Sequence, residues 1–218
     1  MRMKMWKLFT GVMVTFTSIS ENVSAKEFDF KPLASLCRVE VKLSTSFGSG
    51  SVRGTFGKIA GKIAFTPEYP QDTNGRISLS SRSLRFNNAK IAYDSHSPKW
   101  LNSSKYPEIS FKINSLQAFS WHGRELRADA EGTLTIKGNE KAVTIPMSIH
   151  YFRGQRRQYE GKAGDLLKIE GLLAIPISEF GLSAGAGIDA IGKEVEVMVS
   201  VTGASNHVRP LLPSPLFR

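Results

Sequence analysis

The stretch Glu131-Gly-Thr-Leu-Thr-Ile-Lys-Gly-Asn-Glu-Lys-Ala142, continued by Val143-Thr-Ile-Pro-Met-Ser-Ile149, decides the fold of this chain. Apolar side chains occupy every second position on both sides of residues 137–141, a segment whose Gly and Asn predict a turn. Such alternation on both sides of a turn predicts an antiparallel hairpin with one buried face. The apolar set is Leu134, Ile136, Val143, Ile145, Met147 and Ile149.

The same period of two recurs along the chain, with hardly a helical period anywhere. Alternating runs are predicted as strands at residues 39–43, 59–65, 77–86, 109–113, 126–136, 143–151, 167–175 and 195–201. A protein made of hairpins with one apolar face has to close into a sandwich or a barrel, and a barrel can hold a ligand. We therefore predict an all-β fold, an antiparallel barrel of about eight strands.

One long segment, residues 91–107, breaks the rhythm and predicts a short helix or a compact loop inserted between hairpins. Trp100 and Leu101 in this segment are large apolar groups, which a loop rarely exposes. We expect residues 94–106 to control access to the barrel, with Trp100 at its rim. The alternative is that Trp100 simply plugs one end of a packed barrel.

The first 25 residues predict a cleaved secretory signal. Arg2, Lys4 and Lys7 form a positive start, a short apolar run follows, and Val23-Ser24-Ala25 offers the small residues that signal peptidase reads. The apolar run is too short and too rich in threonine and serine for a membrane span; an uncleaved amphipathic anchor is the alternative. We expect a periplasmic protein with a barrel domain at residues 26–205 and a Pro-rich tail at residues 206–218.

The net charge and the single cysteine limit the classes of partner and of bound group. The formal net charge is +10, which on an exported protein suggests contact with an anionic membrane surface or simple solubility. The predicted export signal argues against nucleic acid as the partner. Arg153-Gly-Gln-Arg-Arg157 is interpreted as a solvated hairpin tip, with an anionic-lipid contact as the sharper alternative. Cys37 is the single cysteine, so no intramolecular disulfide or cysteine metal site can form.

The residues that carry catalysis and metal binding are sparse. The four histidines have no His, Cys or carboxylate neighbour at metal-ligand spacing, so we expect no metal site. No nucleophile elbow, no phosphate-binding glycine loop and no obvious pair of carboxylates occurs. We therefore predict no catalytic residue, no cofactor and no enzyme activity.

The chain resembles the YceI-like family of periplasmic, lipocalin-like barrels that bind polyisoprenoid lipids. The resemblance spans residues 39–203 and depends on four motifs in this order. They are Ser51-Val-Arg-Gly-Thr-Phe-Gly57, Ser97-Pro-Lys-Trp-Leu-Asn-Ser-Ser-Lys-Tyr-Pro-Glu-Ile-Ser-Phe111, Gly132-Thr-Leu-Thr-Ile-Lys-Gly138 with Val143-Thr-Ile-Pro146, and Ile177-Ser-Glu-Phe-Gly-Leu182. Two positions depart from the family pattern, because Ser46 and Asp94 stand where many relatives carry a histidine; His96 lies two residues beyond Asp94.

The resemblance implies a ligand held in the barrel lumen, an isoprenoid quinone or polyprenyl lipid. The expected cavity residues are Phe56, Phe65, Trp100, Leu101, Phe111, Leu134 and Phe180. The expected polar residues of the mouth are Ser46, Asp94 and His96. The departures at the histidine positions leave the choice of headgroup open.

Three functions are compatible with these observations. The first is a carrier or sequestering protein for an isoprenoid lipid. The second is an enzyme that acts on an amphiphilic lipid in the same cavity, using Asp94 or His96. The third is a ligandless structural or stress-related envelope module, and a homodimer is left open for all three.

Overall fold

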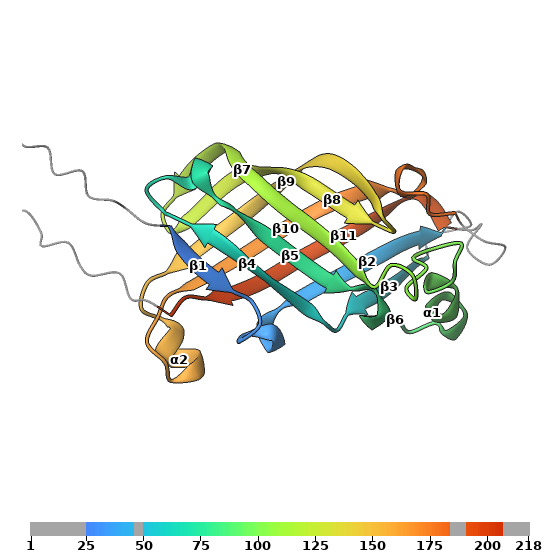
Figure 1. Cartoon of the computed structure of the whole chain (residues 1–218), viewed down its shortest axis with the longest axis horizontal. Coiled ribbons are helices and arrows are strands. Elements are labelled where there is room, and N and C mark those ends of the chain that lie inside the picture. The colour runs from blue at the N-terminus through green and yellow to red at the C-terminus, as the bar shows by residue number, and fades with distance from the viewer. Residues whose placement is uncertain (1–24, 46–49, 184–190, 207–218) are drawn as a thin grey trace, which may run out of the picture.

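Eleven strands form one antiparallel sheet that closes on itself (Figure 1) in the computed structural model, which describes residues 25–45, 50–183 and 191–206. The strands are β1 (Lys26–Asp29), β2 (Arg38–Thr45), β3 (Ser51–Phe56), β4 (Ile59–Phe65), β5 (Asn74–Ser80), β6 (Leu84–Phe86), β7 (Glu108–His122), β8 (Glu125–Ile136), β9 (Asn139–Phe152), β10 (Leu166–Pro176) and β11 (Ile191–Ala204). The helices are α1 (Ala89–Ser95) and α2 (Arg156–Glu160), and 3-10 turns lie at Ala34–Leu36, Pro70–Asp72, Ser81–Ser83 and Ile177–Phe180.

The eleven strands occupy eight positions around the barrel. Three of these positions hold two strands each, one after the other along the barrel: β1 with β2, β3 with β4, and β5 with β6. This arrangement follows because β1 pairs with β4 at the same neighbouring position where β2 pairs with β3. Strand β11 closes the ring by pairing with β10 on one side and with both β2 and β1 on the other. The predicted antiparallel barrel of about eight strands is confirmed. Strands β1 and β3 are not among the predicted strands; β1 has only four residues, which are too few to establish a period.

The break between β1 and β2 is filled by the only cysteine. The Cys37 thiol accepts a hydrogen bond from the backbone N–H of Thr202 on β11 at 3.4 Å, in place of a strand partner. Burial raises the pKa of this thiol, although the bond from Thr202 opposes the shift. Cys37 therefore serves as a half-buried, protonated filler of the sheet.

The hairpin that decides the fold has a tighter turn than predicted. Strand β8 ends at Ile136 and β9 begins at Asn139, so the turn is Lys137-Gly138 rather than residues 137–141. Both turn residues have positive φ, 52° and 76°, which is the geometry of a type I′ turn between twisted strands. The predicted buried face is confirmed: Leu134, Ile145 and the other alternating residues point inward.

The interior differs between the two ends of the barrel. Beside α2, the side chains of Phe28, Phe65 and Tyr151 pack together, with Phe28 and Phe65 fully buried and ring centroids 6.2–6.3 Å from Tyr151. Toward α1, at the opposite end in Figure 1, inward residues from the strands surround a hollow. Large aromatic rings fill one half, and the other half remains open.

A buried carboxylate joins elements at the packed end. Asp165 is fully buried and accepts hydrogen bonds from Lys26 Nζ at 2.5 Å, from the Tyr151 hydroxyl at 2.7 Å and from the Gly154 N–H at 2.7 Å. Burial acts to raise the pKa of Asp165, but these bonds and the Lys26 charge together lower it. The start of β1, the end of β9 and the segment before β10 are thereby held together.

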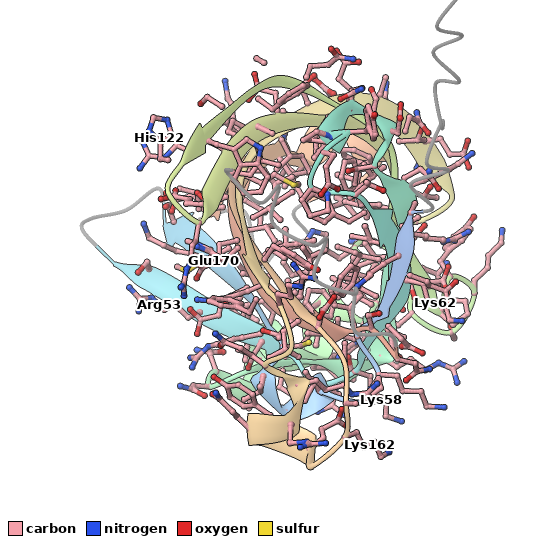
Figure 2. The ribbon with its side chains drawn as sticks, turned by 90° about the vertical axis from the view of Figure 1, so that its left-hand side faces the viewer. Arg53, Lys58, Lys62, His122, Lys162 and Glu170 are labelled. Carbon is pink, nitrogen blue, oxygen red and sulfur yellow. The ribbon has the colours of Figure 1, made fainter. Side chains whose placement is uncertain are left out.

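The basic cluster predicted as a surface tip is divided by the fold. Arg156 is 3 % exposed; its guanidinium pairs with Glu160 and donates to the Ser205 carbonyl, which fastens α2 to the end of β11. Arg153 and Arg157 remain exposed. Figure 2, viewed from the α2 end, shows other basic side chains pointing away from the ring of strands, at Arg53, Lys58, Lys62 and Lys162. Within the described ranges, no helix has the length and hydrophobicity needed to cross a membrane.

Candidate ligand cavity

The hollow half of the barrel is lined almost wholly by apolar side chains. The space open to the centre of a water-sized sphere is about 130 Å³. Its walls come from every barrel position and from the inserted segment. The lining residues include Val39, Val41, Phe56, Ile77, Leu84, Trp100, Leu101, Ile109, Phe111, Leu134, Ile136, Ile145, Met147, Leu173, Ile175, Leu182, Val195, Val197 and Val199.

Five of the seven predicted cavity residues line this space, namely Phe56, Trp100, Leu101, Phe111 and Leu134. Phe65 and Phe180 are buried but do not line it. Phe65 belongs to the packed half. Phe180 lies in the 3-10 turn after β10, where its carbonyl accepts a bond from Asn139 Nδ2 at 2.8 Å. Contact of any of these residues with a ligand stays a prediction.

Of the predicted polar residues of the mouth, Asp94 and His96 do not line the cavity. Ser46 lies outside the described residues, and Asp94 sits near the end of α1 without lining the hollow. His96 has both ring nitrogens engaged, with Nε2 3.1 Å from the Leu84 carbonyl and Nδ1 2.9 Å from Ser103 Oγ. The Leu84 carbonyl can only accept, so Nε2 carries a proton and donates it to this bond. His96 holds the inserted segment to β6.

Several lining residues are not among those predicted from the sequence, for example Met147, Leu173 and Val197. Each belongs to an alternating run that is predicted as a strand, so the alternation already indicates its inward direction. What the alternation does not give is the height of a residue along the barrel axis, which decides whether it packs the closed half or faces the hollow.

Trp100 covers the hollow from the inserted segment. Its ring is 3 % exposed and stacks on Phe86, with ring centroids 6.2 Å apart and an angle of 23° between the planes. Phe86 in turn lies over Gly54, where an added Cβ would come within 2.6 Å of the phenyl ring. The glycine of the first motif therefore makes room for the aromatic stack. The indole Nε1–H has no acceptor among the described residues.

Phe111 reaches the hollow in a similar way. Its partner across the strands is Leu134, and its ring covers Gly132 on β8, where an added Cβ would meet the ring at 2.6 Å and the Lys112 carbonyl at 2.2 Å. A side chain at residue 132 would push this ring aside. The glycine of the third motif thus fixes the shape of the cavity wall.

The inserted segment is fastened to the barrel by several hydrogen bonds. Ser81 Oγ donates to the Tyr106 carbonyl at 2.6 Å and Arg82 Nε donates to the Ser103 carbonyl at 3.0 Å. On the other side, Lys137 Nζ donates to the carbonyls of Lys99 at 3.3 Å and Gly181 at 2.7 Å. The hairpin turn that decides the fold therefore also holds the cover of the cavity.

The cavity offers little reactive chemistry. No acidic, basic or nucleophilic side chain is among its lining residues, apart from Ser110, whose hydroxyl accepts a hydrogen bond from Arg76 at 2.9 Å. In the described part of the chain, no three His, Cys, Asp or Glu side chains gather as a metal site would require. The geometry suits the enclosure of an apolar guest.

A closed eight-position antiparallel barrel with an apolar hollow at one end defines a lipocalin-like binding barrel. The sequence profile of the YceI-like domain matches residues 16–203, and the chain belongs to this family. Protein YceI of Salmonella arizonae is 27% identical over 150 residues, which cover 69% of this chain and 72% of the relative.

Solved structures share the fold at low sequence identity. Burkholderia cenocepacia BcnA superposes with a TM-score of 0.62 and 18% identity, covering 78% of this chain and 97% of BcnA. A polyisoprenoid-binding domain from Saccharophagus degradans gives a TM-score of 0.61 and 12% identity over 84% of this chain and 99% of that domain. A Campylobacter jejuni YceI protein gives 0.58 and 16% identity over 94% and 100% of the two chains.

Proposed function

We propose that this protein binds and carries, or sequesters, a long-chain isoprenoid lipid in the hollow half of its barrel. One observation carries the proposal: the hollow is roomy but has almost no polar lining. A volume of about 130 Å³ would accommodate on the order of ten waters, each of which needs two to four polar partners. The walls do not offer those partners, so an apolar guest fits this space better than water does.

The relatives support an isoprenoid as the guest. The Saccharophagus degradans domain that shares this fold is a polyisoprenoid-binding domain. Burial of apolar carbon contributes about 0.8 kcal/mol per methylene, so an isoprene unit of five carbons adds up to about 4 kcal/mol. Affinity should therefore rise with tail length until the lumen is full.

The indole of Trp100 favours a lipid that carries an acceptor oxygen. A buried N–H without an acceptor costs about 1–3 kcal/mol, and Trp100 Nε1–H lacks one among the described residues. A quinone carbonyl or a polyprenyl phosphate oxygen would supply it after a small shift of the ring, whereas a pure hydrocarbon would not.

Carriage requires no catalytic group. The rival function, an enzyme acting on an amphiphilic lipid, would need Asp94 or His96 at the reacting atoms. His96 already has both ring nitrogens engaged by protein groups, and Asp94 is away from the lining. The present contacts therefore favour binding over turnover.

The proposed setting is the periplasm, after removal of the signal near Ala25. Strand β1 begins at Lys26, so cleavage at that point would leave every described strand intact. The strongly basic charge suits transient contact with an anionic membrane surface, where a carrier would exchange its lipid.

Organic extraction of the protein purified from its native envelope, followed by mass spectrometry, tests the proposal. An isoprenoid lipid at near-equal molar amount is the expected result. Phe111→Asp should lose the lipid, because an unpaired charge would face the hollow. Lys112→Asp, on the exposed face of the same strand, is the matched control and should retain it. A folded wild-type protein that yields no lipid and binds no added isoprenoid quinone would refute carriage.

A further inference from the structure

The wall of the barrel is incomplete between β9 and β10. These strands pair from Leu166↔Phe152 to Gly171↔Met147, and the ladder stops there. Both strands continue, because β8 remains paired with β9 to Asn139 and β11 remains paired with β10 to Pro176. Residues 139–146 of β9 and 172–176 of β10 thus face each other without strand pairing. We call this opening in the ladder the lateral window.

The window begins at a proline. Proline has no backbone N–H, so it cannot donate to a neighbouring strand. The Pro146 carbonyl lies 3.4 Å from the position that a Cβ on Gly171 would take, so the backbone of Pro146 faces β10. The next pair in register, Pro146 with Leu172, therefore lacks its donor on the β9 side. The Val-Thr-Ile-Pro motif at residues 143–146 sets the place where the wall opens.

The window is bounded at its other end as well. Asn139 Nδ2 donates to the Phe180 carbonyl, and Lys137 Nζ donates to the Gly181 carbonyl. Side chains thus bring β9 and the segment after β10 back together where the ladder does not. The opening has two closed ends, which distinguishes it from frayed strand termini.

The wall at the edge of the window is thin. Gly171 has no side chain, and it lines both the inner hollow and a groove on the outer surface, as do Met147 and Val199. Inward from the window stand Ile145 and Leu173, both of which line the hollow. Met147, Gly171 and Val199 are therefore wall residues shared by the groove and the lumen, whereas Arg127, Asp129 and Glu170 line the groove alone.

The outer rim of the window is uncharged and largely apolar from residue 142 onward. Leu172 is 59% exposed, and its cross-strand partner Met198 is 53% exposed. Exposed strand edges are normally protected by charged side chains, and closed barrels have no edges at all. An unprotected opening of this kind in a barrel wall points to passage of an apolar molecule. The outward residues bordering this part of the gap are Ala142, Thr144, Pro146, Leu172 and Ala174.

Described side chains stand over both ends of the hollow. Phe28, Phe65 and Tyr151 fill the α2 end. At the α1 end, Trp100 and Leu101 cover the lumen, and their segment is fastened by hydrogen bonds to Ser81, Arg82 and Lys137 and by the His96 bridge.

We propose that the lipid enters and leaves the barrel sideways, through the lateral window between β9 and β10, rather than under the cover at the α1 end. This inference rests on the proposed function, because it assigns a route to the ligand of the same cavity. Passage requires Val143, Ile145 and Leu173 to move aside, and no strand pairing has to break. The apolar tail remains in contact with apolar surface throughout.

The test closes the window and measures ligand exchange. Thr144→Cys and Ala174→Cys are introduced into a Cys37→Ser background; continuing the register from Gly171↔Met147 places them opposite each other on the outer face. A short, reducible cross-linker joins the two thiols. Uptake and release of an isoprenoid quinone are followed by quenching of tryptophan fluorescence. Both rates should fall by about tenfold or more with equilibrium affinity unchanged, and reduction should restore them.

Two stapled controls separate the routes. Lys168→Cys with His150→Cys joins the same strands where they are already paired and should leave the rates unchanged. Lys99→Cys with Ser183→Cys fastens the cover, where the Ser183 N–H already donates to the Lys99 carbonyl, and should also leave them unchanged. Slow exchange from the stapled cover, or normal exchange through the stapled window, overturns the lateral route.

A variant without added cysteines provides an independent check. Pro146→Val restores the missing N–H with a residue that favours strands, so β9 and β10 should pair further and exchange should slow. Normal rates in both this variant and the stapled window would contradict the proposal. Failure of the wild-type protein to bind any isoprenoid quinone would instead refute the proposed function, so the two failures are distinguishable.

Discussion

At the scale of single residues, the indole N–H of Trp100, which lacks an acceptor among the described residues, predicts a preference between ligands that can be measured. Trp100→Phe keeps an aromatic ring against Phe86 but removes the N–H. We expect the variant to bind squalene, a pure isoprenoid hydrocarbon, about as well as the wild type does. Its affinity for an isoprenoid quinone should fall by about tenfold, because the carbonyl loses its donor. Titration calorimetry with both ligands checks this, and an equal loss for both would show that Trp100 contributes only packing.

A second prediction at this scale concerns Asp165. Its pKa is lowered in the folded protein, so at acidic pH the unfolded chain binds more protons than the folded one does. The stabilisation is therefore present above the ordinary aspartate pKa of about 4 and is lost as pH falls through the lower folded value. Asp165→Asn should destabilise the protein by about 3 kcal/mol at pH 7, because Lys26 loses its buried partner.

The difference between Asp165→Asn and the wild type should narrow as the pH is lowered from about 5 toward about 2. Urea unfolding across that pH range measures it. Asp72→Asn, at an exposed position, is the control and should differ little from the wild type at any pH. A constant difference between Asp165→Asn and the wild type would mean that shape, and not charge, is what Asp165 contributes.

At the scale of elements, the turn between β8 and β9 links the hairpin to the cover of the cavity. Lys137→Met should leave global stability nearly unchanged while removing the bonds to the Lys99 and Gly181 carbonyls. Amide hydrogen exchange should then quicken in residues 97–106, with the strands unaffected. Lys141→Met, on the same hairpin but without these bonds, is the control. Unchanged exchange in residues 97–106 would mean that the other fastenings hold the cover alone.

The elements also show what could be predicted from the sequence. Period-two alternation predicted most of the strands, though not β1 or β3, and it predicted their inward faces, because the direction of a side chain is a local property of a strand. It did not separate Phe65, which packs the closed half, from Phe111, which faces the hollow. The height of a residue along a barrel depends on register and tilt across several strands, and no single segment contains that information.

Two further features escaped the sequence for related reasons. His96 was predicted at the mouth, but its bonds to Leu84 and Ser103 arise from a tertiary contact between α1 and β6. Pro146 lies within a family motif, yet its effect on the ladder appears only once its backbone is known to face β10. Proline inside an alternating run would have been the signal, since it is restricted to edges and irregularities in sheets.

At the scale of the whole molecule, the first described strand of the barrel begins at Lys26, which bears on how the protein is made. Lys26 is the first residue of β1, pairs with Phe65 on β4 and places its Nζ on the buried Asp165. Cleavage within β1 would remove these contacts, whereas cleavage after Ala25 preserves them. We therefore expect N-terminal sequencing of protein recovered from the envelope to begin at Lys26 or a near neighbour.

Replacing Ala25 with a bulky residue such as Trp should leave the precursor unprocessed, because signal peptidase requires small side chains there. A protein recovered from the cytosol with Met1 in place would rule out export, and with it the periplasmic setting of lipid carriage.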